Sequence, residues 1–288
     1  MANILAVGNA TIDIINTVDA YPREDEEIRA ISQRIARGGN AANTLVVLHQ
    51  LGHAGWWAGT LADEPNTQYI RNDLARFHID TRYSRTVSPG TAPTSYVALS
   101  RHNGSRTIIH YRDLPEFDYE SFAAIPLHRF DWIHFEARNV PDTRKMLDLL
   151  RMKIPKMRVS IEIEKPRIDV DTLFAYADVL LFSRAFAQTF GVSDGHTFLR
   201  RIKGDYNLRA DLYCTWGAQG AVALSQYNEQ FYRTAIESVH VIDTLGAGDT
   251  FNAAVIDGHV RGQSIEQTLH QACEVAGKKC GKIGLELD

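Results

Sequence analysis

One aspartate follows directly on a run of small residues: Gly246, Ala247 and Gly248 precede Asp249. Residues with almost no side chain let backbone N–H groups crowd around an anion. Residues 250–256 have a helical pattern, which places this loop at a helix N-terminus, where unpaired amides and the helix dipole favour phosphate. A carboxylate there can accept the proton of a hydroxyl that attacks a γ-phosphoryl group. The pattern therefore predicts phosphoryl transfer with Asp249 as general base.

A simpler alternative is that Asp249 only caps the helix, as a lone aspartate before a helix usually does. Capping does not require two glycines and an alanine just ahead of it. The two usual nucleotide-binding patterns do not fit either, because Asp249 stands where a P-loop has its lysine and Phe251 where a dinucleotide fingerprint has its third glycine.

Polar residues that suit sugar hydroxyls lie early in the chain. Gly39, Asn40 and Asn43 precede a helix expected to end at Leu51, and the two asparagines share a face if the helix has begun. Amides both donate and accept hydrogen bonds, as hydroxyl recognition requires. Asn40 is equally well explained as a helix cap, and Asp13 as the end of the first loop.

A second candidate site lies at the end of an apolar strand, residues 212–215. Thr215 ends this strand, and Trp216, Gly217 and Gly220 form the turn that follows it. Ligands of open α/β sheets bind beyond the carboxyl ends of the strands, so this turn is a candidate nucleotide edge. A plain hairpin into residues 221–224 explains it equally well. Arg106, after the turn-forming Asn103-Gly104, is on the residues alone a solvated hairpin arginine.

The elements that must position these residues alternate between short apolar runs and helical patterns. We expect strands at residues 4–7, 55–59, 132–135, 159–163, 179–182 and 212–215, and helices at 43–51, 67–77, 141–153, 171–176 and 185–190. This alternation predicts an α/β fold with a doubly wound, largely parallel sheet and helices on both faces.

Two stretches break that rhythm with strand-like alternation, and we expect them to form one small antiparallel β lid. The predicted domains are therefore a core of residues 1–11, 38–89 and 113–288, and a lid of residues 12–37 and 90–112.

Composition bounds the rest of the interpretation. The chain has 288 residues and a net charge of −4, which gives no electrostatic reason to expect nucleic acid or an anionic membrane as partner. An odd number of cysteines, three, fits reduced thiols. The first residues lack the basic start of a signal peptide and no apolar run is of membrane-spanning length, so we expect a cytoplasmic protein.

The segment from Asp243 to Ala254 closely resembles the C-terminal signature of the ribokinase-like (PfkB) carbohydrate kinases. Further segments at residues 21–29, 32–43, 131–139, 159–167 and 275–281 are similar to the ketohexokinase branch of this family. The resemblance implies a doubly wound α/β core with a β lid, an anion hole formed by Gly246, Ala247 and Gly248, and Asp249 as the base.

The resemblance also implies roles for other residues. The sugar would be held by Asp13, Gly39, Asn40, Asn43, Arg106 and Glu136, and ATP by Arg106, Thr215, Trp216, Gly217, Gly220, Gly246, Gly248 and Cys273. A potassium ion would be bound by Asp243, the Leu245 carbonyl and residues 280–284. Mg²⁺ would accompany ATP, but the family's Asn-x-x-Glu motif is absent after residue 182. Glu136, Glu162 and Glu164 are candidates for organising metal-bound water, or are paired with Arg138, Lys165 and Arg167.

The expected activity is ATP-dependent phosphorylation of a ketohexose hydroxyl, such as fructose to fructose 1-phosphate. A related acceptor (ribose, a keto-deoxy sugar acid or a nucleoside) is the alternative within the class, and a non-catalytic sugar- and nucleotide-binding regulator is the alternative outside it. Exposed lid edges tend to be covered, and the resemblance implies a homodimer paired through the lid.

Overall fold

A large, mostly parallel sheet forms the centre of the computed structural model, which describes residues 1–227, 229–233 and 240–287. Its order is β14-β13-β12-β11-β10-β9-β1-β4; the six strands from β12 to β4 are parallel, and β13 and β14 are antiparallel. The strands are β1 (Asn3–Val7), β4 (Ala54–Ala58), β9 (Trp132–Glu136), β10 (Arg158–Ile163), β11 (Val179–Phe182), β12 (Asp211–Thr215), β13 (Ala221–Leu224) and β14 (Gln230–Arg233).

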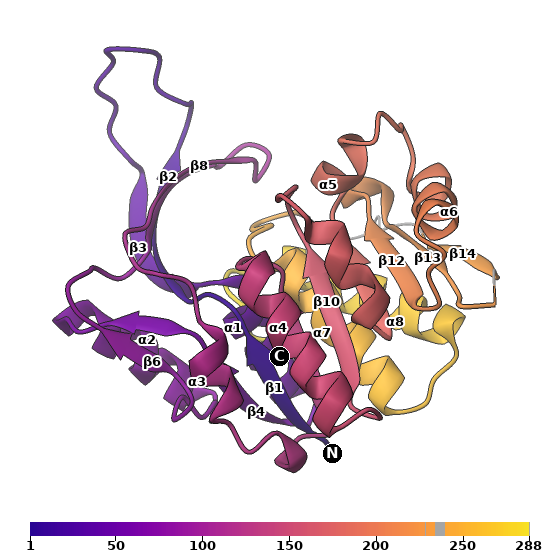
Figure 1. Cartoon of the computed structure of the whole chain (residues 1–288). Coiled ribbons are helices and arrows are strands. Elements are labelled where there is room, and N and C mark those ends of the chain that lie inside the picture. Colours follow the sequence, from indigo (N-terminus) through magenta and orange to yellow (C-terminus); the bar gives the residue numbers. More distant parts are fainter. Residues whose placement is uncertain (228, 234–239, 288) are drawn as a thin grey trace.

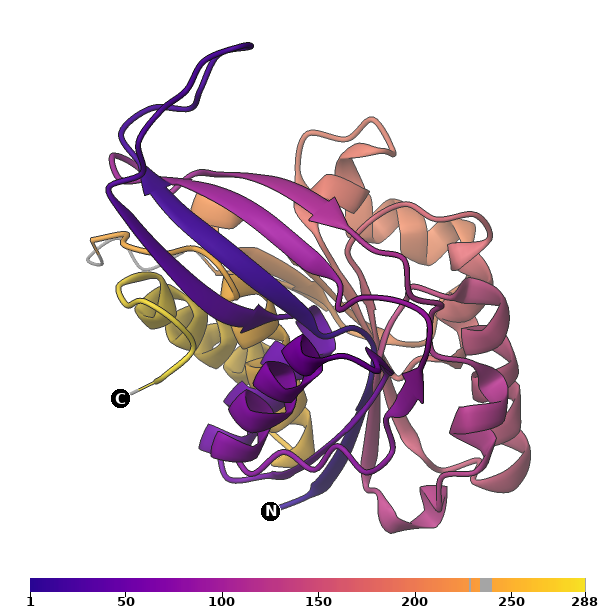
Figure 2. The ribbon, with the colours of Figure 1, turned by 90° about the vertical axis from the view of Figure 1, so that its left-hand side faces the viewer.

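Helices cover both faces of this sheet, as Figure 2 shows from the side. Successive side chains of a strand point to opposite faces, so Leu5 and Val7 enter one hydrophobic core while Ile4 and Ala6 enter the other. The first core is closed by α3 (Tyr119–Ala123), α4 (Val140–Lys153), α5 (Arg184–Gln188), α6 (Gly195–Asp205) and the 3₁₀ helix η2 (Val170–Tyr176). The second is closed by α1 (Asn40–Gln50), α2 (Pro65–Arg76), α7 (Ala247–Val260) and α8 (Ile265–Cys280).

A smaller four-stranded sheet projects from the body as the expected lid (Figure 1). It consists of β2 (Thr11–Val18), β3 (Ser32–Gly38), β7 (Thr94–Ser100) and β8 (Arg106–Tyr111), in the order β3-β2-β7-β8. Each excursion of the chain is antiparallel within itself, but the pair β2–β7 that joins the two excursions is parallel. Sequence alternation predicts strands but not the direction in which two distant hairpins meet.

The sequence predicted most core elements and missed some details. The helix expected from residue 43 begins at Asn40, and the one expected at 171–176 is the 3₁₀ helix η2. The helices α3 and α6 were not expected, nor was the short parallel pair β5 (Thr60–Ala62) and β6 (Arg85–Val87). The single-turn 3₁₀ helices η1 (Leu127–Arg129) and η3 (Gly217–Gln219) were also not expected. Within the described residues, no helix combines the length and the hydropathy needed to cross a membrane.

Candidate active site

Asp249 lies in the first turn of α7, and Gly246, not Asp249, is the N-cap residue. Gly246 has φ 77°, a left-handed conformation that glycine adopts without strain. The cap interpretation of Asp249 is therefore wrong. Its carboxylate is buried and accepts a hydrogen bond from Asn43 Nδ2 at 2.6 Å. The Asp249 side chain, near the start of α7, therefore points toward the first residues of α1.

Asn43 connects Asp249 to a positive charge. Its Oδ1 accepts from Arg37 Nη1 at 2.6 Å, and Arg37 Nε is paired with Asp73 at 2.7 Å. Burial raises the pKa of Asp249 to about 7; the charges of Glu164 and Glu136 add to this, while the Asn43 hydrogen bond and the Arg37 charge oppose it. A carboxylate with a pKa near neutrality is matched to general-base work at physiological pH.

Asn40 is the first residue of α1, and Gly39 is its N-cap, so Asn40 is not the cap either. Its Nδ2 donates to Glu162 Oε1 at 3.1 Å. Gly39 has φ 102°, and a Cβ there would lie 2.2 Å from the Asn9 carbonyl, so only glycine fits this close approach of two backbones. Asn40 and Asn43 therefore each donate to a buried carboxylate of another element, Glu162 of β10 and Asp249 of α7.

The three candidate glutamates have different environments. Glu136 is paired with Arg138 at 3.2 Å and accepts from the Asn9 amide at 2.9 Å, and Glu164 is paired with Lys165. Glu162 has neither arginine nor lysine as partner among the described residues, and its buried Oε2 has no hydrogen-bond partner there. Burial and the charges of Asp249, Glu136 and Glu164 raise the pKa of Glu162 well above its ordinary value, and the neighbouring Asn252 side chain opposes this rise.

An unpartnered buried carboxylate oxygen fits a hard cation, because Mg²⁺ prefers oxygen ligands and neutralises nearby negative charge. The sequence left all three glutamates open; the structure distinguishes Glu162 from the two that are ion-paired.

Asp13 lies on β2, where its Oδ1 accepts from Thr11 Oγ1 at 2.8 Å. A Cβ at Gly38 would lie 2.2 Å from Asp13 Oδ2, so the carboxylate packs directly on the backbone that leads into Gly39. Asp13 thus lies next to the start of α1, which carries Asn40 and Asn43.

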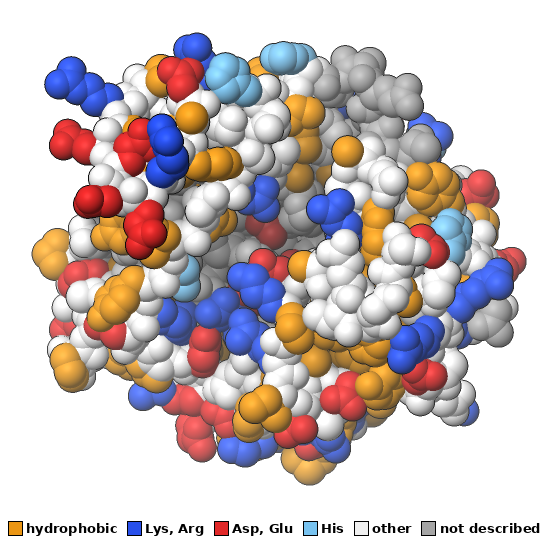
Figure 3. Space-filling view, turned by 90° about the horizontal axis from the view of Figure 1, so that it is seen from above, with side chains coloured by type: hydrophobic (Ala, Val, Ile, Leu, Met, Phe, Trp, Pro, Cys, Tyr) orange, Lys and Arg blue, Asp and Glu red, His pale blue; other side chains and the backbone are white. Residues whose placement is uncertain are grey.

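The lid contacts the loop before α7 through two arginines; in addition, Thr244 Oγ1 donates to the Gly104 carbonyl at 3.2 Å and Leu245 packs against the buried side chains of the lid. Arg106 Nη1 donates to Thr244 Oγ1 at 2.9 Å, and Arg34 Nη2 donates to Asp243 Oδ2 at 2.7 Å. Arg106 is therefore not merely a solvated hairpin arginine. Seen from the side of the lid, the molecule is hollowed near its centre, and basic and acidic side chains line the hollow (Figure 3).

The predicted nucleotide residues lie at one end of the sheet. Thr215 ends β12 opposite Ala221, and Trp216 donates its amide to the Gly220 carbonyl at 2.7 Å. Gly217, with φ 63°, begins η3 and so starts the tight turn that the glycines predicted. Cys273 of α8 is buried against this edge, where its Sγ lies 3.9 Å from the Arg233 carbonyl. Burial raises the pKa of Cys273 to about 12, which makes it a packing residue instead of a reactive thiol.

Asp243, the first residue expected to bind potassium, already has two basic groups beside it, Lys279 and Arg34. Lys279 Nζ donates to the Asp243 carbonyl at 2.7 Å and lies 3.7 Å from its Oδ2. Asp243 Oδ1 accepts from the Leu245 amide at 2.9 Å. The carboxylate and carbonyl of Asp243 therefore already have a positive charge as partner. The sequence alone does not indicate that Lys279 is buried against Asp243, because a lysine in the last turn of an amphipathic helix is ordinarily solvated.

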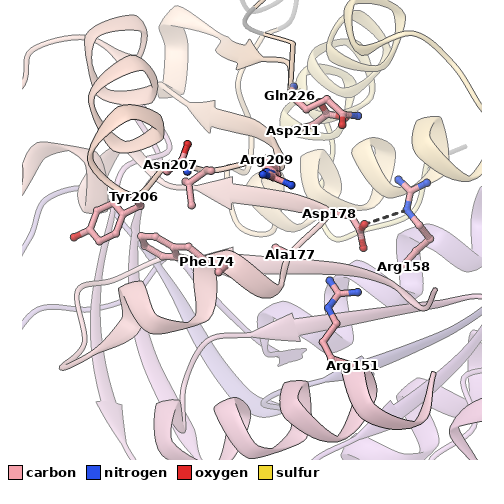
Figure 4. A pocket seen from close by; sticks show the side chains of 12 residues that line it. Arg151, Arg158, Phe174, Ala177, Asp178, Tyr206, Asn207, Arg209, Asp211 and Gln226 are labelled. Carbon is pink, nitrogen blue, oxygen red and sulfur yellow. Dashed lines mark hydrogen bonds and ion pairs between the residues drawn. The ribbon is translucent and has the colours of Figure 1, made fainter. Parts of the chain in front are cut away.

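A cavity of about 500 Å³ lies elsewhere, lined in part by Arg151, Arg158, Arg209, Asp178 and Asp211 (Figure 4). Arg158 and Asp211 are the first residues of β10 and β12, so the cavity is at the amino ends of the strands. Asn9, Glu136 and Thr215, in contrast, follow or end strands β1, β9 and β12. Because parallel sheets bind ligands at the carboxyl ends, the cavity is not the site of the chemistry.

This fold and this cluster of residues match a known class of protein. Residues 1–287 match the pfkB family of carbohydrate kinases, and the chain belongs to that family; it is an ATP-dependent carbohydrate kinase. It is 40% identical over 290 residues to ketohexokinase of Mus musculus, covering 98% of this chain and 97% of the mouse protein.

Solved structures agree with this assignment at the level of the fold. A putative ribokinase from Agrobacterium tumefaciens superposes with a TM-score of 0.85 at 19% identity, covering 98% of this chain and 92% of the other. Ribokinase from Cryptococcus neoformans in complex with ADP gives 0.79 at 16% identity, covering 99% and 96%.

Proposed function

We propose that this protein transfers the γ-phosphoryl group of ATP to a ketohexose hydroxyl, giving fructose 1-phosphate or a close analogue. The observation that carries the proposal is Asp249: a buried carboxylate in the first turn of α7, with a pKa raised to about 7. In this proposal Asp249 removes the hydroxyl proton as the oxygen attacks phosphorus.

The anion hole is proposed at the N-terminus of α7, over Gly246, Ala247 and Gly248. The first amides of a helix have no carbonyl one turn earlier to accept them. The Ala247 amide is 3.3 Å from the Thr244 carbonyl, so the amides that follow it in the first turn are the better placed for the transferring phosphoryl group. Arg106, held at Thr244, would add positive charge beside it.

The sugar is proposed to enter beneath the lid, residues 12–37 and 90–112, and to be held by Asp13, Gly39, Asn40 and Asn43. Glu136 would take part from the core side. Support for a ketohexose comes from the 40% identity to the mouse ketohexokinase. Ribose, a keto-deoxy sugar acid or a nucleoside remains the alternative acceptor within the same family.

The nucleotide is proposed to lie along Thr215, Trp216, Gly217 and Gly220, with Cys273 lining an apolar slot for adenine. Mg²⁺ would be held through Glu162, whose buried Oε2 has no partner among the described residues. When bound, Mg²⁺ neutralises charge on the triphosphate; Glu162 would orient it or its water from beside Asp249.

We also propose a cytoplasmic homodimer paired through the lid. One row of residues runs across all four lid strands, because Ile14 pairs with Ile35 and with Tyr96, and Tyr96 pairs with Ile109. Three of the four are strongly exposed, Ile109 at 70%. An exposed apolar row of this kind marks an interaction surface, and a second copy would bury it.

An ADP-release assay over a panel of sugars tests the proposed function. We expect the highest kcat/KM with fructose or another ketohexose. A clear preference for ribose or a nucleoside would contradict the proposed ketohexose acceptor but would agree with the proposed phosphoryl transfer from ATP. ATP binding without ADP release on any sugar would contradict the proposal and favour a non-catalytic regulator.

A further inference from the structure

Lys279 is a lysine in an unusual place. It lies in the last turn of α8, is 1% exposed and ranks among the largest fully buried side chains. Its neighbour Lys278 is on the solvent side and pairs with Glu274 at 2.6 Å. Burying an ammonium group is costly unless partners compensate for the lost water, so the surroundings of Lys279 must supply such partners.

Those partners all belong to Asp243. Nζ donates to the Asp243 carbonyl at 2.7 Å and lies 3.7 Å from Oδ2, and the Asp243 side chain is itself 1% exposed. The second basic group at this carboxylate is Arg34 of the lid, 2.7 Å from Oδ2. One buried carboxylate thus has two cations beside it.

The pair fixes the start of the loop that carries the proposed anion hole. Asp243 Oδ1 accepts from the Leu245 amide at 2.9 Å, and Gly246 then caps α7. Thr244 between them holds Arg106. A charge that holds both the carbonyl and the carboxylate of Asp243 therefore positions the backbone immediately before Gly246.

Among the groups expected to bind potassium, the oxygen atoms of Asp243 and of the Cys280 carbonyl are already used as acceptors. The Asp243 carbonyl and carboxylate serve Lys279 and Arg34, and the Cys280 carbonyl accepts from the amides of Ile242 at 2.8 Å and Asp243 at 3.2 Å. A further cation would also be repelled by two positive charges near one carboxylate.

We propose that the ammonium group of Lys279 takes the place of a bound monovalent cation at Asp243, so that the enzyme needs no potassium. An ammonium group and K⁺ are both monovalent cations that bind to backbone and carboxylate oxygens, and Lys279 provides one covalently attached to α8. The inference rests on the proposed kinase function. Lys279 is then a positioning residue, since it acts on the phosphoryl group only through the Asp243–Gly246 backbone.

The test measures kinase activity in a tetramethylammonium buffer free of K⁺, and again after addition of K⁺ or NH₄⁺. For the unaltered protein we expect kcat to change less than about twofold. Lys279→Ala should lower kcat roughly tenfold or more in the K⁺-free buffer, as loss of a charge-assisted hydrogen bond predicts. Its KM for the sugar should change little, and K⁺ or NH₄⁺, but not tetramethylammonium, should restore part of the kcat.

Thermal unfolding supplies a readout independent of activity: K⁺ should raise the Tm of Lys279→Ala and leave that of the unaltered protein unchanged. Lys278→Ala, one residue away and exposed, should behave as the unaltered protein in both assays. Strong activation of the unaltered protein by K⁺ would overturn the inference while upholding the kinase function.

The inference would also be overturned if Lys279→Ala folds but neither K⁺ nor NH₄⁺ restores any of its kcat. If Lys279→Ala does not fold, the same measurements of kcat and Tm on Lys279→Met, together with the cation response of the unaltered protein, test the inference. No kinase activity on any sugar would instead contradict the proposed function.

Discussion

The side-chain amide of Asn43 joins Arg37 to Asp249: its Oδ1 accepts from the guanidinium at 2.6 Å and its Nδ2 donates to the carboxylate at 2.6 Å. A cation and a buried acid are thereby connected through one neutral group. Both interactions favour the ionised form of Asp249 and oppose the effect of burial on its pKa.

Asn43→Ala removes this connection. The pKa of Asp249 should rise, because a hydrogen bond to a charged group is worth about 1.5–3 kcal/mol. The ascending limb of the plot of kcat/KM against pH should therefore shift to higher pH by about one unit. A pH profile of kcat/KM measures this. Asn66→Ala, on the exposed side of α2, is the control, and an unchanged profile in Asn43→Ala would mean that Asn43 does not tune the base.

Asp249→Asn keeps the shape of the side chain and abolishes its basicity. We expect kcat to fall roughly 10²–10⁴-fold, the contribution typical of general acid–base catalysis. Sugar binding, followed by calorimetry, should persist because Asp13, Asn40 and Asn43 are unchanged. A near-normal kcat in this variant would remove Asp249 from the mechanism.

The raised pKa of Asp249 also predicts how stability depends on pH. An acid whose pKa is higher in the folded chain binds its proton more tightly there, so the folded state gains from protonation below about pH 7. The free energy of unfolding should therefore decline as pH rises from about 4 to 7. Denaturant unfolding across this range should show a weaker decline in Asp249→Asn, and an identical dependence in both proteins would contradict the raised pKa.

Glu162→Gln tests the proposed magnesium residue. The change preserves size and an oxygen that can accept from Asn40, but it removes the charge beside Asp249. The Mg²⁺ concentration for half-maximal activity should rise roughly 10–100-fold, the range seen when groups supporting a metal are altered. Glu266→Gln, on the exposed side of α8, supplies the comparison; equal Mg²⁺ requirements in the two variants would exclude Glu162.

The lid row predicts the assembly. Ile109→Lys places a charge on the most exposed residue of the apolar row, at its β8 end, and should convert the homodimer to a monomer in light scattering at micromolar concentration. Ile168→Lys alters a residue that is 87% exposed and lies outside the lid strands, and it should leave the dimer intact. A monomeric unaltered protein would refute the dimer directly.

Local patterns in the sequence were sufficient for most of the strand–helix order, although not for α3 and α6, and for the loop at Gly246–Asp249, because glycine conformation and helix termini are properties of neighbouring residues. The Asn43–Asp249 contact spans 206 positions, and the parallel β2–β7 pair joins two separate excursions. Such contacts depend on the packed fold. The burial of Lys279 likewise follows from the position of α8 against Asp243, and its own neighbours in the sequence do not reveal it.

Arg34 and Arg106 come from opposite edge strands of the lid, β3 and β8, and both reach the Asp243–Thr244 segment. The lid is thus tethered at two corners to the loop that precedes Asp249. Any tilting of the lid that admits sugar must strain or release at least one tether, so access to the site and readiness of the catalytic loop are mechanically linked. A partner that clamps the lid from outside would, through the same two arginines, also hold that loop.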